Sequence, residues 1–207
     1  MKEQPDPPGE RERPEIGRAF VAVRPPEPVL DAVAAAIEAG RPPWDGLRWD
    51  GLRWEGPDHW HLTVQFLGPV ARLAPVTDAL AAAVAGRAAF PFRLGGAGAF
   101  PTVRRARVVW VGASEGEAAM VALAGAVNAA LAEVGYEVER RAFRPHVTLA
   151  RLKVPGDVGS VLAAIGAELV GPSFRVEEVL LYQSRLSGTG ATYSVLGRFP
   201  LNSAGGA

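Results

Sequence analysis

The stretch His61-Leu62-Thr63-Val64 returns 85 residues later as His146-Val147-Thr148-Leu149. Both copies follow the pattern His-apolar-Thr-apolar, and together they hold two of the chain's three histidines. With six threonines in 207 residues, chance would place Thr two positions after a histidine only about 3% of the time. Two matches among three histidines therefore indicate a duplicated functional element.

Apolar and polar residues alternate in both copies, and this alternation predicts a β-strand for each. Side chains two positions apart on a strand share a face. His61 and Thr63 should therefore point together, while Leu62 and Val64 face the core. If the second copy lies on a strand that faces the first, two imidazoles and two hydroxyls surround one small volume.

Such a set of groups is sufficient to cleave a phosphodiester by acid–base chemistry. Histidine can serve as base or acid near neutral pH, because its ordinary pKa is about 6.5. Thr hydroxyls can bind the non-bridging phosphate oxygens, where charge is held in the transition state. A strained cyclic phosphate is already activated and would need no metal. The catalytic candidates are His61, Thr63, His146 and Thr148, whereas His59 has no Thr two places on and is expected to be a bystander.

The surrounding sequence predicts a second level of repetition, in which strand, helix, motif strand, helix and strand occur in that order twice. A loop without regular structure is expected over 41–57, where Trp44 to Arg48 is repeated as Trp49 to Arg53. The first round comprises 18–23, 27–39, 60–67, 76–85 and 90–94, and the second comprises 107–111, 115–133, 146–151, 158–169 and 174–182, with a last strand over 192–199.

This repetition predicts an α+β fold of two lobes related by a pseudo-two-fold axis, each with a sheet covered by helices on one face. The two motif strands would meet at a central cleft. We expect a single domain over 16–201, with halves of roughly 16–100 and 101–201, and leave open whether the halves exchange elements. The Pro-, Glu- and Arg-rich residues 1–15 predict a disordered tail, and 202–207 a flexible end.

Composition excludes several classes of function. Basic and acidic residues number 22 each, so the chain lacks the basic excess of proteins that wrap nucleic acid, and any such contact should be limited to a strand end or a nucleotide. The absence of cysteine excludes disulfides and thiolate chemistry. The histidine spacing predicts no metal site, and no cofactor is expected. Without a membrane-length apolar run or a signal peptide, we expect a cytoplasmic protein.

Five stretches resemble the 2H phosphoesterases, and within them the bacterial and archaeal RNA 2′,3′-cyclic phosphodiesterases, also called 2′-5′ RNA ligase-like proteins. They span nearly the whole chain, and the two motifs with their flanks are specific to that family. The stretches are 18–23, 61–68, 106–112, 143–151 and 193–196.

The resemblance implies hydrolysis of a terminal 2′,3′-cyclic phosphate to a 2′-phosphate without a metal or cofactor. It implies that His61 donates a proton to the departing 3′ oxygen and that His146 activates water, while Thr63 and Thr148 bind the phosphate. Arg151 would add a charge-assisted contact, and Phe66 would lie beside the nucleotide. The partners would be RNA 3′ ends or nucleotides that carry the cyclic phosphate, bound by a monomer.

Two residues depart from this pattern. Strand alternation puts Arg151 on the face opposite His146, so it reaches the cleft only if the strand ends or bulges near Ala150. Gln65 stands where the family often has Lys. Other readings also stay open: a relative that acts on another phosphodiester, such as a cyclic ADP-ribose phosphate or a 2′-5′ oligonucleotide, and a non-catalytic nucleotide or RNA-end binding module. Ligation, the reverse reaction, is expected to be minor in water.

Overall fold

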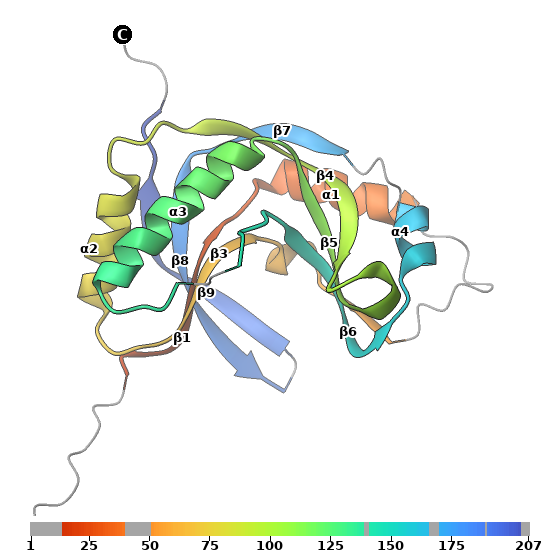
Figure 1. The fold of residues 1–207 in the computed structure, drawn as a ribbon, viewed down its shortest axis with the longest axis horizontal. Coiled ribbons are helices and arrows are strands. Elements are labelled where there is room, and N and C mark those ends of the chain that lie inside the picture. The colour runs from red at the N-terminus through yellow and green to blue at the C-terminus, as the bar shows by residue number, and fades with distance from the viewer. Residues whose placement is uncertain (1–13, 40–50, 139–140, 166–169, 189, 204–207) are drawn as a thin grey trace, which may run out of the picture.

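The computed structural model describes residues 14–39, 51–138, 141–165, 170–188 and 190–203 (Figure 1). In these ranges nine strands form one antiparallel sheet with four α-helices packed against it. The strands are β1 (Ile16–Val23), β2 (Leu52–Trp54), β3 (Leu62–Val70), β4 (Phe90–Phe100), β5 (Ala106–Glu115), β6 (Val147–Gly156), β7 (Val170–Val176), β8 (Glu178–Ser187) and β9 (Gly190–Pro200). The helices are α1 (Glu27–Ala39), α2 (Leu73–Val84), α3 (Glu117–Glu133) and α4 (Gly159–Ile165).

The strands follow the order β7-β4-β5-β6-β3-β1-β8-β9, with β2 paired to β6. The two motif strands, β3 and β6, are therefore neighbours at the middle of the sheet. They are joined by a single residue pair, Leu62 with Val147. Beside β3 lies β1 and beside β6 lies β5, each an earlier strand of the chain. This arrangement confirms the predicted α+β fold, except that the two lobes share one continuous sheet where a sheet in each was predicted.

The two lobes exchange elements. Strand β4 follows the first motif but pairs with β5, whereas β8 and β9 come last and return to β1. The helices cross over as well, because α1 packs against β7 and α4, while α2 and α3 pack on each other (Figure 1). Each lobe is thus built from both halves of the sequence, and a cut near residue 100 would separate no compact unit.

The main core lies between the sheet and the helices. Strand β1 shows how the sheet divides its two faces: Val21 and Val23 belong to the main core, whereas Phe20 and Ala22 join a smaller cluster on the other face. The apolar motif positions point into the main core, and Leu62 and Val147 are both 0% exposed. The polar motif positions must then face the side that carries the smaller aromatic cluster.

Most predicted elements are present, with shifted ends, and three predictions were wrong. The strand predicted over 174–182 is two strands, because β7 pairs with β4 in one lobe and β8 pairs with β1 in the other. Part of the predicted loop 41–57 is regular, because Leu52–Trp54 finds a backbone partner in β6 and Pro57–His59 forms a 3-10 turn. The helix predicted from Glu115 begins at Glu117, after Gly116 with φ 79°.

Other predictions lie partly outside the described residues. These include most of the expected tails, since 1–13 and 204–207 are not described, the first copy of the tandem repeat, and the end of the helix predicted over 158–169.

Two glycines should respond in opposite ways to alanine. A Cβ on Gly98 would overlap the Trp110 ring, which is buried, so Gly98→Ala should destabilise the fold by about 1–3 kcal/mol. A Cβ on Gly125, inside α3, would meet no atom within 4 Å, so Gly125→Ala should stabilise it by about 0.5–1 kcal/mol. Urea unfolding of the two variants measures both effects. A Gly98→Ala variant as stable as the wild type would contradict the packing described for Trp110.

Candidate active site

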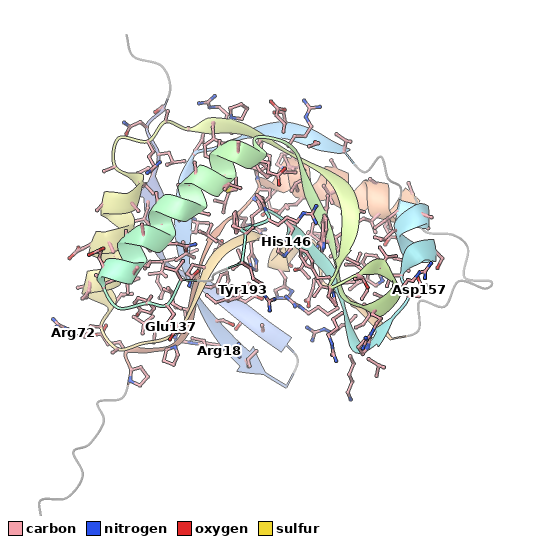
Figure 2. The ribbon with its side chains drawn as sticks, in the orientation of Figure 1. Arg18, Arg72, Glu137, His146, Asp157 and Tyr193 are labelled. Carbon is pink, nitrogen blue, oxygen red and sulfur yellow. The ribbon has the colours of Figure 1, made fainter. Side chains whose placement is uncertain are left out.

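The single pairing between the motif strands sets the register of all four polar motif residues. Because Leu62 pairs with Val147 in an antiparallel register, the same register sets His61 opposite Thr148 and Thr63 opposite His146. These four flank the two buried residues and face the other side of the sheet. His61, Thr63 and Thr148 line a cleft of about 730 Å³. His146 is not among the residues that line it, and its ring lies against Phe100 and Trp110. Figure 2 shows His146 and Tyr193 in the central part of the molecule.

A bulge in β6 brings Arg151 to this cleft. Strict alternation from His146 would bury Arg151, but the pairing of β5 with β6 shifts by one residue after Thr148. Leu149 and Ala150 are consequently both buried, and the next residue returns to the open face. Arg151 lines the cleft together with His61. The condition set by the sequence, a bulge near Ala150, is met.

Strand β3 has the matching irregularity. The pairing of β1 with β3 shifts between Thr63 and Gln65, and Val64 and Gln65 are both buried. Phe66 then emerges into the cleft with 70% of its surface exposed. The Gln65 amide points away from the cleft and donates to the backbone oxygen of Glu137 at 2.8 Å. It ties the segment after α3 to the motif strand, so it makes no basic contact in the cleft.

Phe66 and Arg151 occupy equivalent positions, each five residues after its motif histidine and directly after a bulge. One lobe therefore presents a flat aromatic ring and the other a guanidinium. The histidines and threonines are nearly symmetric, and this pair breaks the symmetry. A bound molecule with one apolar, planar end and one anionic group would have a single preferred orientation.

His61 lies among aromatic rings. Its ring centroid is 4.8 Å from that of Phe20 and 5.4 Å from that of Tyr193, which meets it edge-on. A hydrogen bond to the His59 backbone fixes its orientation. Burial lowers the pKa of His61 to about 4, and the positive charges of Arg151 and Arg24 act in the same direction.

His146 is held in an analogous way. Its Nδ1 donates to the backbone oxygen of Arg144 at 2.7 Å, and since a carbonyl only accepts, Nε2 is the nitrogen left for chemistry. Phe100 meets the ring edge-on at 5.0 Å, and Trp110 lies 6.2 Å away. Burial lowers the pKa of His146, and the charges of Arg151 and Arg144 lower it further. Both imidazoles are thus predominantly neutral at pH 7 in the free protein.

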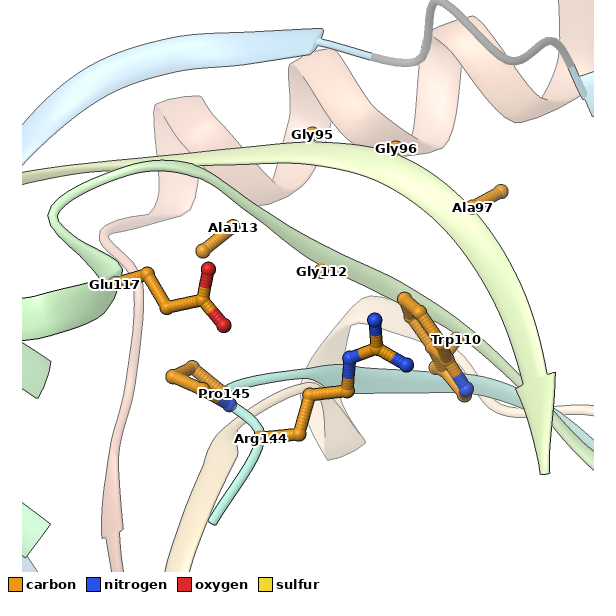
Figure 3. Close-up of a pocket in the computed structure, with 9 residues that line it drawn as sticks. All are labelled: Gly95, Gly96, Ala97, Trp110, Gly112, Ala113, Glu117, Arg144 and Pro145. Atoms are coloured by element: carbon orange, nitrogen blue, oxygen red, sulfur yellow. The ribbon is translucent and has the colours of Figure 1, made fainter. Parts of the chain in front are cut away.

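A smaller hollow of about 210 Å³ lies beside Trp110 and is also lined by Arg144 and Pro145 (Figure 3). The Arg144 guanidinium covers the Trp110 ring, with 5.0 Å between its central carbon and the ring centroid. Gly96 and Gly112 leave the floor open, and the Glu117 carboxylate stands at the opposite end (Figure 3). The hollow thus lies close to His146, whose ring centroid is 6.2 Å from that of Trp110.

Several cleft residues were not predicted from sequence. His59, expected to be a bystander, lines the cleft, and its Nε2 lies 2.9 Å from the backbone oxygen of Ala191. Tyr193 stands between His59 and His61, and burial raises the pKa of its hydroxyl. Tyr193 lies in the last stretch that resembles the family, and this position could have identified it as a cleft residue from the sequence. No sequence signal pointed to Glu55 and Arg53, because only the pairing of β2 with β6 brings them to the cleft.

Within the described ranges, no helix is long and apolar enough to cross a membrane. No cluster of three or more His, Asp or Glu side chains suited to a metal ion occurs there either.

The family model of the 2′-5′ RNA ligase superfamily matches residues 25–188. The chain belongs to this superfamily. Two curated relatives are named RNA 2′,3′-cyclic phosphodiesterase. The one from Thermus thermophilus is 35% identical over 193 residues, which are 89% of this chain and 90% of the relative. The one from Geobacillus stearothermophilus is 34% identical over 149 residues, 70% of this chain but 46% of the relative, so the chain spans about half of that protein's length.

Solved structures agree with this assignment. A crystal structure of a Thermus thermophilus protein superimposes with a TM-score of 0.71 at 30% identity, over 91% of this chain and all of the other. Escherichia coli LigT, crystallised with 3′-AMP, gives a TM-score of 0.66 at 27% identity, over 90% of this chain and 99% of the other.

The buried imidazoles predict acid sensitivity. The unfolded chain, with an ordinary histidine pKa of about 6.5, binds more protons than the folded one between pH 6.5 and 4. The free energy of unfolding should therefore fall as the pH falls through this window. His61→Gln removes the titrating ring and should lose less stability than the wild type between pH 7 and pH 4.5, measured by urea unfolding. Equal losses in both proteins would contradict the low pKa.

Proposed function

We propose that this protein hydrolyses the 2′,3′-cyclic phosphate at an RNA 3′ end, or on a nucleotide, to a 2′-phosphate without a metal ion. The observation that supports this proposal is the antiparallel register at Leu62 and Val147, from which strand alternation puts two imidazoles and two hydroxyls on one face. The names of the relatives support the same reaction. We further propose that the protein acts as a cytoplasmic monomer.

In this mechanism His146 is the base and His61 the acid. Nε2 of His146 takes a proton from water, and the water oxygen attacks phosphorus. The bond from phosphorus to the 3′ oxygen breaks, and protonated His61 gives its proton to that oxygen. The 2′ bond stays intact, so the product is a 2′-phosphomonoester, and the two imidazoles have exchanged protonation states.

The low pKa values fit this cycle once the substrate is bound. The neutral form of His146 is the one a base requires. His61 must carry a proton, and a phosphodiester bound between the motifs brings a negative charge that favours the imidazolium. Substrate binding would thus recruit a proton to the cleft, and a bell-shaped pH profile is expected.

The remaining cleft residues would hold the substrate. Thr63 and Thr148 hydroxyls donate to the non-bridging oxygens, and the Arg151 guanidinium adds a charge-assisted contact. Phe66 offers an exposed ring on which a terminal base can stack. Because all four bases have an aromatic face, this contact would tolerate any terminal nucleotide.

Removal of either motif histidine should abolish most turnover. His61→Ala and His146→Ala should each lower kcat by about 10²–10⁴-fold, the usual contribution of a general acid or base. The assay follows hydrolysis of a 2′,3′-cyclic nucleotide and of a short cyclic-phosphate-ended RNA in EDTA. His59→Ala is the matched control and should lose less than about tenfold.

Wild-type turnover in a soluble, folded His146→Ala variant would contradict the proposal. If the wild type binds nucleotides saturably but turns over neither substrate, the protein is a binding module instead.

Arg151 and Phe66 should separate into two kinds of substrate contact. Arg151→Ala should lower kcat/KM by about 10–100-fold and weaken inhibition by inorganic phosphate, because hydrogen bonds to charged groups contribute about 1.5–3 kcal/mol. Phe66→Ala should raise KM for nucleotides by roughly 5-fold or more through lost stacking, yet leave phosphate inhibition unchanged. Equal loss of phosphate inhibition in both variants would contradict these roles.

A further inference from the structure

A carboxylate stands beside the cation assigned to the phosphate. The side chain of Glu55 is only 17% exposed and lines the cleft. Its Oε1 lies 2.8 Å from Arg53 Nη2 and 3.5 Å from Arg151 Nε, and its Oε2 lies 3.9 Å from His59 Nδ1. The Tyr193 hydroxyl is the other titratable group that senses this charge. Glu55 is therefore a fixed negative charge in a cleft that we propose to bind anions.

The backbone holds Glu55 in this place. Its N–H donates to the Leu149 oxygen at 2.8 Å, and its carbonyl accepts the Trp60 indole N–H at 2.9 Å. Strand β2 pairs with β6 so that Arg53 lies opposite Arg151. The end of the second copy of the tandem repeat, Leu52 and Arg53, begins this strand, and Glu55 directly follows it. The backbone is thus held on both sides of the residue, and the carboxylate pairs with Arg53 and Arg151 in the cleft.

Glu55 acts on substrate and product unequally because their charges differ. A cyclic phosphodiester carries one negative charge, whereas a phosphomonoester carries about −1.5 to −2 at pH 7. A fixed carboxylate repels both, and repels the monoester more strongly. It also shares Arg151 with whichever phosphate is bound.

We propose that Glu55 is a positioning and specificity residue that weakens binding of the phosphomonoester product relative to the cyclic substrate, and so promotes product release. This inference rests on the proposed function. For two charges about 7 Å apart, one unit of charge would change binding by roughly threefold in water-like surroundings, and by roughly fiftyfold at an effective dielectric constant of about 20.

Glu55→Gln removes the charge and keeps the shape. Relative to the wild type, this variant should bind 2′-AMP more tightly at pH 7.5, measured as Kd by calorimetry. The factor by which this Kd decreases should be at least about three times the factor by which KM for adenosine 2′,3′-cyclic phosphate decreases. At pH 5, where 2′-AMP is mainly a monoanion, the difference from wild type should shrink. Glu55→Asp retains the charge and should restore the wild-type preference. Glu178→Gln is the matched control, because Glu178 pairs with Arg198 at 2.6 Å outside the cleft.

Three outcomes would overturn the inference. Equal tightening for substrate and product would mean that Glu55 merely competes for Arg151. Weaker binding of both would mean that it only orients the guanidinium. Both results are read only if the wild-type protein hydrolyses the cyclic substrate, so they do not contradict the proposed function. A wild type that hydrolyses neither the nucleotide nor RNA overturns the proposed function itself, and the role of Glu55 with it.

Discussion

The antiparallel contact between Leu62 and Val147 is the constraint on which the rest of the cleft depends. Both side chains are fully buried, and in the described part of the chain they are the only residues through which the two motif strands pair. Their burial forces the four flanking polar side chains to the opposite face. Within the sheet the lobes meet at this one pair, and the chain crosses between them, because β4 joins the lobe of β5 and β8 returns to β1.

Two bulges then convert a symmetric framework into an asymmetric site. Each bulge buries two successive residues and returns the next one to the cleft, so Phe66 and Arg151 reach equivalent places with different chemistry. The acid–base pair alone could accept a phosphodiester in either direction. In the proposed function, an aromatic ring on one side and a guanidinium on the other would give the substrate one orientation, and Glu55 would add a charge that distinguishes the cyclic substrate from the phosphomonoester product.

Much of this arrangement could be predicted from the sequence. The repeated His-apolar-Thr-apolar pattern carries its own periodicity, so it fixes which side chains share a face. The element order follows from similar local signals. Local signals do not predict which strands pair, because pairing joins segments that are distant in sequence. Nothing near residue 177 shows that the strand before it pairs with β4 and the strand after it pairs with β1. Bulges are invisible for the same reason, which is why alternation placed Arg151 on the wrong face. Glu55 lay in a segment read as loop, because a three-residue strand gains its stability from β6 and not from its own sequence.

The most direct test of the central claim is the regiochemistry of the product. A short RNA that ends in a 2′,3′-cyclic phosphate is hydrolysed in EDTA, and the terminus is compared by chromatography with 2′- and 3′-phosphate standards. The account predicts the 2′-phosphate alone, because Phe66 and Arg151 hold the nucleoside in one direction between the two histidines. A 3′-phosphate, or a mixture of the two, would show that the cleft does not orient its substrate in this way.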